Sequence, residues 1–506
     1  MLSLVGSVAS STLGFLLVVV ITRGLHAGRG GVLLEAIALF LILSNSVELG
    51  ADTAIVRMVA WYRARHRTQD LRRTLYVALW PVLVIGTVAA ALVFLYAPEL
   101  ADIFIKGRGV DEGASYIRAF APFVPLAAMT TVVLAATRGF GTMTPYVAIQ
   151  NIGLPFLRPL AILGILVAGL GTGTGPIAAA WTLPVAAGLV VSVEALRRLH
   201  RKALQRDDYS RRERPRGRKE LAAEFWRFAA PRGLAGILTI VLIQFNILLV
   251  GAFRSSREAG IYAAANRFTG VGTFALQAVG LAIAPQISAL LAQDAHQRAE
   301  TVFQTATWWL MVLSWPMYIT MAVFAPFLMR VFGPEFVSGQ TALMVLSLAL
   351  LALVGTGNNK IVLLMGGGSA WNLAITTVSL AVNLGLNLLL IPKFGMNGSA
   401  VAFGTSILAD NLMTTLVVRF KMKLQPFGRG YAVVAVGSTL CFGGIGLLVR
   451  ATAGMSLWTF LVSGVVSTSV YLLLIWRFRS LLQLSVLREV LRARGRKSPQ
   501  NSLGTA

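Results

Sequence analysis

Long apolar blocks recur from one end of this 506-residue chain to the other, separated by short polar segments. A helix of about 20 apolar residues spans the roughly 30 Å hydrocarbon core of a bilayer, and most of the blocks reach that length. Charged residues make up 13% of the chain, against about 25% in an average soluble protein. The pattern predicts an all-α polytopic membrane protein.

We count fourteen predicted membrane spans: two sets of six, followed by two more. This division predicts an N-terminal six-helix lobe, a basic cytoplasmic linker, a C-terminal six-helix lobe, two additional transmembrane helices and a basic cytoplasmic tail. These five parts cover residues 1–196, 197–225, 226–420, 430–476 and 477–506, in that order. The spans lie near residues 3–22, 32–60, 75–97, 115–137, 147–169, 174–196, 226–251, 259–291, 303–329, 338–364, 369–391, 397–418, 430–450 and 456–476.

The formal net charge of +25 is concentrated in four basic clusters between apolar blocks. The clusters run over 63–73, 197–219, 419–429 and 477–497, and each follows an even-numbered span. Basic loops stay in the cytoplasm and attract anionic lipid headgroups. The distribution therefore places both termini in the cytoplasm, makes anionic membrane lipids a partner, and argues against a nucleic-acid-binding protein.

An internal repeat relates the two predicted lobes. "GGVLLEAIALF" begins at residue 30 and "AGIYAAANRFT" at residue 259, and each opens with glycine at a predicted outer loop. A second pair, "LGTGTGPIAAAW" and "FGMNGSAVAFG", has a similar offset of roughly 225 to 230 residues. Parallel repeats of this kind are a transporter architecture with the substrate site between the lobes. We expect two lobes related by a pseudo-twofold axis along the membrane normal.

Cationic side chains at membrane depth are costly unless they meet a wet cavity or a partner. Arg267 lies about 10 Å inside its span at 1.5 Å per residue, beside three alanines. Arg158 lies between two prolines, Arg232 follows a proline, and Lys360 follows two asparagines. We predict that these four line a substrate cavity. The alternative is that they reach the interface or form structural ion pairs.

Three acidic residues are candidates for ion coupling. Glu48 and Asp52 are four residues apart and so share one face of the second span, and Asp410 lies in the twelfth. Carboxylates there could hold Na⁺ or share a proton, or they could pair with arginines. The single cysteine, Cys441, lies in an apolar run and excludes a disulfide framework. The sequence shows no metal-ligand spacing and no nucleotide motif, so no cofactor is predicted.

Several stretches resemble the bacterial polysaccharide flippases, which export lipid-linked oligosaccharides and share a superfamily with the lipid II flippase and the multidrug and toxin extrusion transporters. They are "VGAFRSSREAGIYAAANRF" with "AVGLAIAPQIS", "ITRGLHAGRGGVLLEAIALF", and "LIPKFGMNGSAVAFG". The resemblance implies a central cavity whose cations hold the phosphate of the carrier lipid. It also implies that Arg267 occupies an eighth-helix arginine position and Arg23 a first-helix one.

Together these features predict a flippase in the bacterial cytoplasmic membrane. It would carry a polyprenyl-phosphate- or pyrophosphate-linked oligosaccharide, or a cell-wall precursor, from the inner to the outer leaflet by alternating access. We expect a monomer coupled to Na⁺ or H⁺, with glycan-synthesis enzymes as candidate partners. An ion-coupled multidrug efflux transporter is the alternative. A membrane enzyme is not expected, because the predicted outer loops are too short for a catalytic site.

Overall fold

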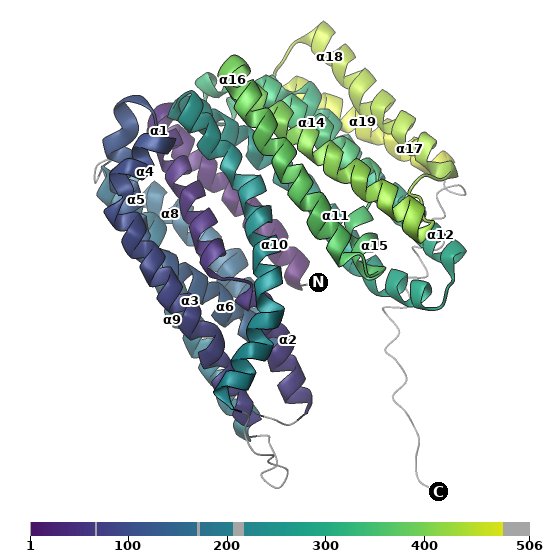
Figure 1. Ribbon diagram of the computed structural model, residues 1–506. Helices are drawn as coiled ribbons and strands as arrows, with labels where there is room; N and C mark the ends of the chain where they lie inside the picture. Colours follow the sequence, from purple (N-terminus) through teal and green to yellow (C-terminus); the bar gives the residue numbers. More distant parts are fainter. Residues whose placement is uncertain (1, 66–67, 170–172, 206–216, 479–506) are drawn as a thin grey trace, which may run out of the picture. The chain divides into compact units, whose positions relative to one another are not determined.

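The computed structural model describes residues 2–65, 68–169, 173–205 and 217–478, and this part of the chain is built from helices (Figure 1). The helices are α1 (Leu2–Val47), α2 (Ala51–Ala64), α3 (Thr68–Leu95), α4 (Ala97–Phe104), α5 (Val110–Phe120), α6 (Val124–Gly139), α7 (Thr144–Tyr146), α8 (Leu154–Val167), α9 (Thr174–Gln205), α10 (Arg218–Phe253), α11 (Ser256–Ala292), α12 (His296–Val323), α13 (Ala325–Arg330), α14 (Gln340–Gly355), α15 (Asn359–Met365), α16 (Ser369–Met422), α17 (Arg429–Ser438), α18 (Ile445–Ala453) and α19 (Leu457–Arg477). Single π-helical turns join α7 to α8 and α17 to α18.

Eleven helices in the described residues are long and apolar enough to cross a membrane, or twelve if the bent α11 counts as one span. Two of them are much longer than one crossing needs. The 46-residue α1 contains the non-helical residue His26, and the 54-residue α16 contains Gly395. Each break divides its helix into two segments of membrane-spanning length, which is consistent with the fourteen predicted spans. The prediction of a polytopic all-α membrane protein is confirmed.

The second predicted span, 32–60, is not one continuous helix. The helical backbone ends at Val47 and resumes at Ala51, and both Leu49 and Gly50 have positive φ, at 51° and 76°. Glycine adopts this conformation without strain, whereas leucine does not. The prediction of one span over 32–60 therefore missed a bend beside Glu48.

The described chain packs into two compact units. Unit 1 comprises Met1–Phe274, Ala325–Leu350 and Ser369–Met413, and unit 2 comprises Ala275–Phe324, Leu351–Gly368 and Thr414–Ala506. This division by packing differs from the repeat-based division into lobes at 1–196 and 226–420, because α11, α14 and α16 each contribute to both units. The lobes remain a prediction from the repeat.

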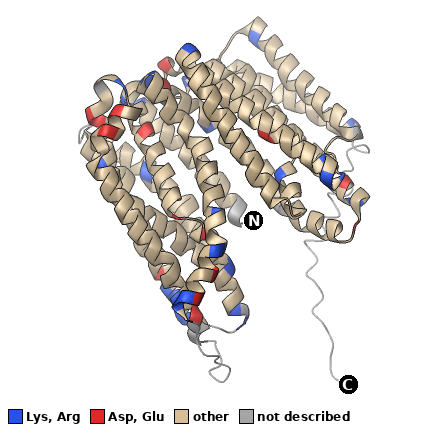
Figure 2. Ribbon diagram, in the orientation of Figure 1, with Lys and Arg blue, Asp and Glu red and all other residues tan. Residues whose placement is uncertain are grey.

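Within unit 1, α10 packs along α1, while α6 is surrounded by α2, α3 and α9. Lys and Arg gather at one end of this unit, at the bottom of Figure 2. Two predicted basic clusters meet there: Arg63 and His200 both contact the Phe140 ring, and Arg218 lies over Tyr76. The linker is shorter than predicted on both sides, since α9 continues to Gln205 and α10 begins at Arg218. Residues 206–216 and 479–506 lie outside the described residues.

Within unit 2, α19 has the side-chain distribution expected of a lipid-facing helix. Its exposed residues include Trp458 and Leu473, whereas Ser467 and Tyr471 are buried. The buried Tyr471 hydroxyl accepts a hydrogen bond from Ser438 at 2.8 Å. A bilayer favours helices whose polar groups form hydrogen bonds with a neighbouring helix and whose apolar groups face the lipid. The last two predicted spans are therefore packed helices rather than loose appendages.

Candidate functional site

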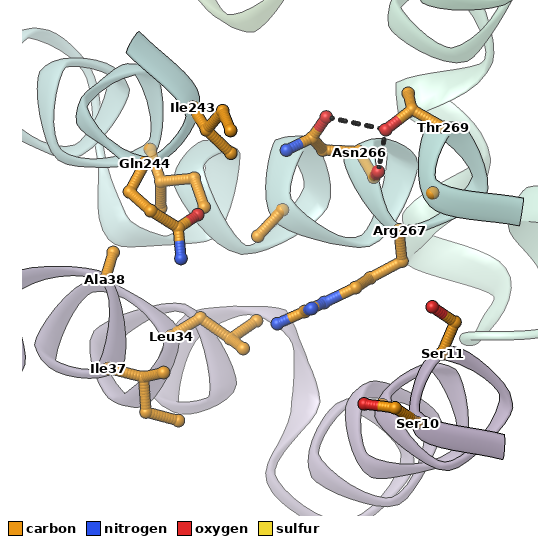
Figure 3. Close-up of a pocket in the computed structure, with 14 residues that line it drawn as sticks. Ser10, Ser11, Leu34, Ile37, Ala38, Ile243, Gln244, Asn266, Arg267 and Thr269 are labelled. Atoms are coloured by element: carbon orange, nitrogen blue, oxygen red, sulfur yellow. Dashed lines mark hydrogen bonds between the residues drawn. The ribbon is translucent and has the colours of Figure 1, made fainter. Parts of the chain in front are cut away.

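A pocket of about 310 Å³ opens inside unit 1 where both segments of α1 meet α10 and α11 (Figure 3). Three helices therefore build it, and α1 is about 200 residues away in sequence from α10 and α11. The lining residues are Ser10, Ser11, Gly14, Leu34, Ile37, Ala38, Ile243, Gln244, Ile247, Ala263, Asn266, Arg267, Thr269 and Gly270. The break at His26 matters here, because it turns the chain back and lets the two segments of α1 form two walls.

Arg267 extends from α11 across this pocket toward Leu34 of α1, with Ser10 and Ser11 beside the base of its side chain (Figure 3). It is the one charged residue among the lining residues. Its neighbours Ala263, Ala264 and Ala265 are buried, and these small side chains let α11 pack closely against the rest of unit 1. In the part of the chain that the structure describes, no acceptor or carboxylate pairs with the guanidinium of Arg267.

Polar side chains line the same pocket as Arg267. The hydroxyls of Ser10 and Ser11 and the amides of Gln244 and Asn266 face the same space (Figure 3). The Asn266 side-chain oxygen accepts a hydrogen bond from the Thr269 hydroxyl at 3.2 Å, which fixes how the amide is turned. Its NH₂ group has no acceptor among the described residues, nor have the Gln244 amide and the two serine hydroxyls.

This arrangement is suited to an oxyanion. A guanidinium offers a planar fork of N–H donors that matches phosphate or carboxylate oxygens, and the neutral amides and hydroxyls supply further donors. A positive charge that is desolvated without a partner is unfavourable, so an anionic ligand would compensate it. Among the described residues, no group of three or more His, Cys, Asp or Glu could hold a metal ion.

Arg23, the other residue implied by the resemblance, has protein partners. Its Nε donates to the carbonyl of Val331 at 2.9 Å and its Nη2 to that of Arg330 at 3.2 Å. These carbonyls lie at the C-terminal end of α13 and just after it, where a helix leaves backbone acceptors without partners inside the helix. In this structure Arg23 ties α1 to the segment after α13, and it does not line the Arg267 pocket.

Replacing Arg23 with Ala should lower the stability of unit 1 by about 1–3 kcal/mol, because two charge-assisted hydrogen bonds to the backbone are lost. A lower melting temperature of the purified protein in detergent would show this. Arg118→Ala, which removes an exposed arginine from α5, is the matched control. Transport loss at an unchanged melting temperature would instead support the substrate role predicted for Arg23.

Arg158 lies on α8 and stacks on Trp181 of α9, with 4.0 Å between the guanidinium carbon and the ring centroid. Its Nε is buried and has no hydrogen-bond partner among the described residues. Neighbouring Leu157 and Leu160 are exposed on the outer face of the bundle. A cation–π contact is worth up to about 2 kcal/mol when desolvated, which explains how this cation is accommodated away from the Arg267 pocket.

Arg232 and Lys360 are not among the residues that line that pocket. Arg232 is exposed on α10, about 18 Å along the helix from Gln244 at 1.5 Å per residue, and its guanidinium lies 5.5 Å from the Phe228 centroid. Lys360 is an exposed residue of α15 in unit 2 and has interactions of its own. Of the four predicted cations in unit 1, the structure thus brings one, Arg267, to the pocket.

The acidic candidates form two separate groups in unit 1. Glu48 is buried at the break before α2, and Asp52, Thr131 and Arg138 are nearby. The prediction that Glu48 and Asp52 share one face of a continuous helix is wrong, because the helix is broken between Val47 and Ala51. Asp410 is buried in the second segment of α16 and accepts a hydrogen bond from Ser379 of the first segment at 3.2 Å. Their role in ion coupling stays a prediction.

Several polar residues that line the pocket or are buried were not among the residues predicted from the sequence. Ser10, Ser11 and Gln244 complete the pocket, and their one signal in the sequence is a polar residue within an apolar span. Glu35 is a second example: it is buried, one carboxylate oxygen accepts from Ser256 at 2.8 Å, and the other has no partner among the described residues.

Comparison with known families supports the resemblance in the sequence. The model of a family described as "Polysaccharide biosynthesis protein" matches residues 1–291, which is more than half of the chain. A second model, MatE, matches residues 231–392. A relative from Haloferax volcanii, described as a probable low-salt glycan biosynthesis flippase, Agl15, is 29% identical over 172 residues. That match covers 33% of this chain and 36% of the relative, so the chain aligns with about a third of its length.

Solved structures share the fold. The lipid II flippase MurJ in an inward closed conformation matches with a TM-score of 0.70 and 13% identity over 94% of this chain and 99% of that chain. An inward-facing multidrug resistance MATE family transporter matches with a TM-score of 0.66 and 16% identity over 82% of this chain and 94% of its own. At such identities the likeness shows the fold alone.

Proposed function

Because the chain belongs to the polysaccharide biosynthesis protein family, we propose that it is a flippase for a lipid-linked oligosaccharide or cell-wall precursor. In this proposal the phosphate or pyrophosphate of a polyprenyl carrier binds at Arg267 while the headgroup crosses from the inner to the outer leaflet. The observation that carries the proposal is a pocket whose described lining holds one charge, that of Arg267, with unused donors from α1, α10 and α11 around it.

The chemistry of the cargo fits this pocket. An anionic headgroup cannot enter the hydrocarbon core unaided, because an unpaired charge there is costly. The cavity, about 310 Å³, lies at the small end of the range for ligand sites. It therefore suits the phosphate group, while the sugars occupy wider solvent-filled space and the lipid tail stays in the bilayer. Alternating access would expose the headgroup first to one side and then to the other.

The remaining predicted residues have subordinate roles in this proposal. Arg158, Arg232, Lys360 and Arg23 stay predicted substrate contacts, and we rank them below Arg267 because each has another environment in this structure or is not among the residues that line the pocket. Na⁺ or H⁺ coupling would use the acidic groups of α2 and α16. We place the protein in the cytoplasmic membrane, with both termini and the basic clusters on the cytoplasmic side, as a monomer.

The alternative, efflux of organic cations, draws on the MatE match and the shared MATE fold. A site for cations should present carboxylates and aromatic faces. The described lining of the Arg267 pocket contains neither. The sign of the charge in the pocket is therefore the reason for preferring an anionic cargo.

Transport by the purified protein in liposomes tests the proposal. Fluorescent oligosaccharide on polyprenyl pyrophosphate is placed in the vesicles, and its arrival in the opposite leaflet is followed with a membrane-impermeant quencher. We expect protein-dependent movement of this lipid and none of the same oligosaccharide on an uncharged polyprenol. Ethidium is the cation control. Ethidium transport without movement of the pyrophosphate lipid would overturn the proposal in favour of efflux.

A further inference from the structure

Unit 1 has a second basic pocket, of about 270 Å³, between α2 and α10. It is lined by Arg57, Met58, Trp61, Glu224, Arg227 and Phe228. Phe228 and Gln244 both lie on α10 and are 16 residues apart, so the second pocket is roughly 24 Å along that helix from the Arg267 pocket at 1.5 Å per residue. The two pockets are therefore separate sites.

Arginines converge on one aromatic ring at this second pocket. The guanidinium carbon of Arg57 lies 4.4 Å from the Phe228 centroid, and that of Arg232 lies 5.5 Å from the same centroid. Arg227 faces the pocket from α10. Within the described ranges, no carboxylate lies within 4.0 Å of any of these three guanidiniums. Glu224 is the one acid in the described lining, and it has contacts of its own.

This gathering of like charges favours an anionic ligand. Two guanidiniums at one ring repel each other, and an anion bound between them would add two attractive interactions that offset this repulsion. A guanidinium stacked on an aromatic face keeps its in-plane N–H donors free. Arg57 can therefore hold Phe228 and an oxyanion at the same time. Met58 and the Trp61 ring add apolar surface beside the cations.

The position of the pocket indicates what the anion belongs to. The helices α2 and α10 that form it run toward the end of unit 1 where Lys and Arg gather (Figure 2), which the predicted topology places in the cytoplasm. A flippase receives its cargo from that side. Cargo at that point has a phosphate group at the level of the interface and an isoprenoid chain next to it, and the pocket combines guanidinium donors with apolar and aromatic side chains.

We propose that the Arg57–Arg227 pocket is a first binding site for the phosphate or pyrophosphate group of the lipid-linked substrate, occupied before the headgroup reaches Arg267. This inference rests on the proposed function, because it takes the same cargo. Bulk anionic phospholipid carries the same phosphate chemistry. The site prefers the substrate, since a pyrophosphate can accept from both arginines while the first isoprenoid unit lies on Trp61 and Phe228.

Direct binding tests the site without transport. The purified full-length protein in detergent is titrated with farnesyl diphosphate by isothermal calorimetry, in an Arg267→Gln background so that the other pocket contributes little. Adding Arg57→Gln and Arg227→Gln should weaken the remaining binding at least about tenfold. The matched control is Arg197→Gln with Arg201→Gln, which removes two exposed charges from the same end of unit 1 and should leave binding unchanged.

Each result of this titration either supports or overturns the proposed first binding site. Unchanged affinity in the Arg57→Gln, Arg227→Gln protein would overturn the site, and so would equal affinity for dihexanoyl phosphatidylglycerol, which would assign the pocket to bulk lipid. Should that double variant fail to fold, Arg57→Lys alone should retain the melting temperature and weaken binding several-fold. Farnesyl diphosphate binding that depends on these arginines would stand even if the liposome assay showed no transport, so the two proposals fail separately.

Discussion

Replacing Arg267 with Ala should reduce transport of the lipid-linked oligosaccharide by roughly 30-fold or more. Truncating one partner of a desolvated, hydrogen-bonded charge pair costs about 2 kcal/mol or more, which corresponds to that factor in kcat/KM. Arg267 is the one charge among the described residues of its pocket, so no neighbouring cation can substitute. Initial rates in the liposome assay, at several lipid concentrations, measure the effect.

Arg267→Lys should also lose most transport. Lysine keeps the charge, but its ammonium is a point donor and cannot make the two parallel hydrogen bonds that a guanidinium makes to phosphate. Arg298→Ala, which removes an exposed arginine from α12, is the control and should leave the rate unchanged. Full transport by both the Ala and the Lys variants at normal protein levels would remove Arg267 from the substrate pathway.

Stability separates this role from a structural one. Arg267 has no described protein partner, so its removal breaks no hydrogen bond or ion pair. Removing a partly buried, unpaired cation should leave the melting temperature unchanged or raise it. Arg23 is expected to behave in the opposite way, because its guanidinium is bonded to two backbone carbonyls. The two variants thus distinguish Arg267, which we expect to bind a ligand, from Arg23, which we expect to stabilise the fold.

Much of the fold could be predicted from the sequence because hydropathy fixes which segments cross the bilayer. The breaks at His26 and Gly395 fall between predicted spans, where the sequence already indicated loops. The break at Leu49 and Gly50 lies inside the predicted span 32–60, and hydropathy did not predict it. The basic clusters predicted which ends of the helices lie on the same side, because the cost of burying charge in hydrocarbon confines them to the membrane surface. Residues of two of these clusters do lie at one end of unit 1.

The candidate site was predictable only in part. Arg267 was predicted because a cation at membrane depth requires a partner or a polar cavity, and Arg267 lines a pocket. Depth alone could not distinguish it from Arg158, whose partner is a tryptophan on the next helix. Nor could depth indicate Gln244, because the pocket exists only where segments more than 200 residues apart converge. Side-chain environment is a tertiary property, whereas depth is a local one.

Two glycines of the predicted repeat lie in contact inside unit 1. Gly31 and Gly260 are the second residues of the two copies, and a Cβ on Gly260 would lie 2.8 Å from the Cα of Gly31. A Cβ on Gly31 would overlap the carbonyl oxygen of Ser256, at a separation of 1.7 Å. Both obstacles are backbone, which cannot rotate away as a side chain can. Equivalent glycines of the two repeats therefore allow α1 and α11 to touch.

Gly31→Ala should consequently destabilise unit 1 by about 3 kcal/mol or more, at or beyond the upper end of the usual cost of overpacking. The melting temperature in detergent should fall by several degrees, or the protein should fail to accumulate. Gly28→Ala is the control, because Gly28 lies on the same helix and a Cβ there meets nothing within 4 Å. If both variants had the melting temperature of the parent protein, the distance between α1 and α11 would have to be larger than it is in this structure. The pocket, which α1 and α11 line together with α10, would then also be wider and a poorer fit for a lone phosphate group.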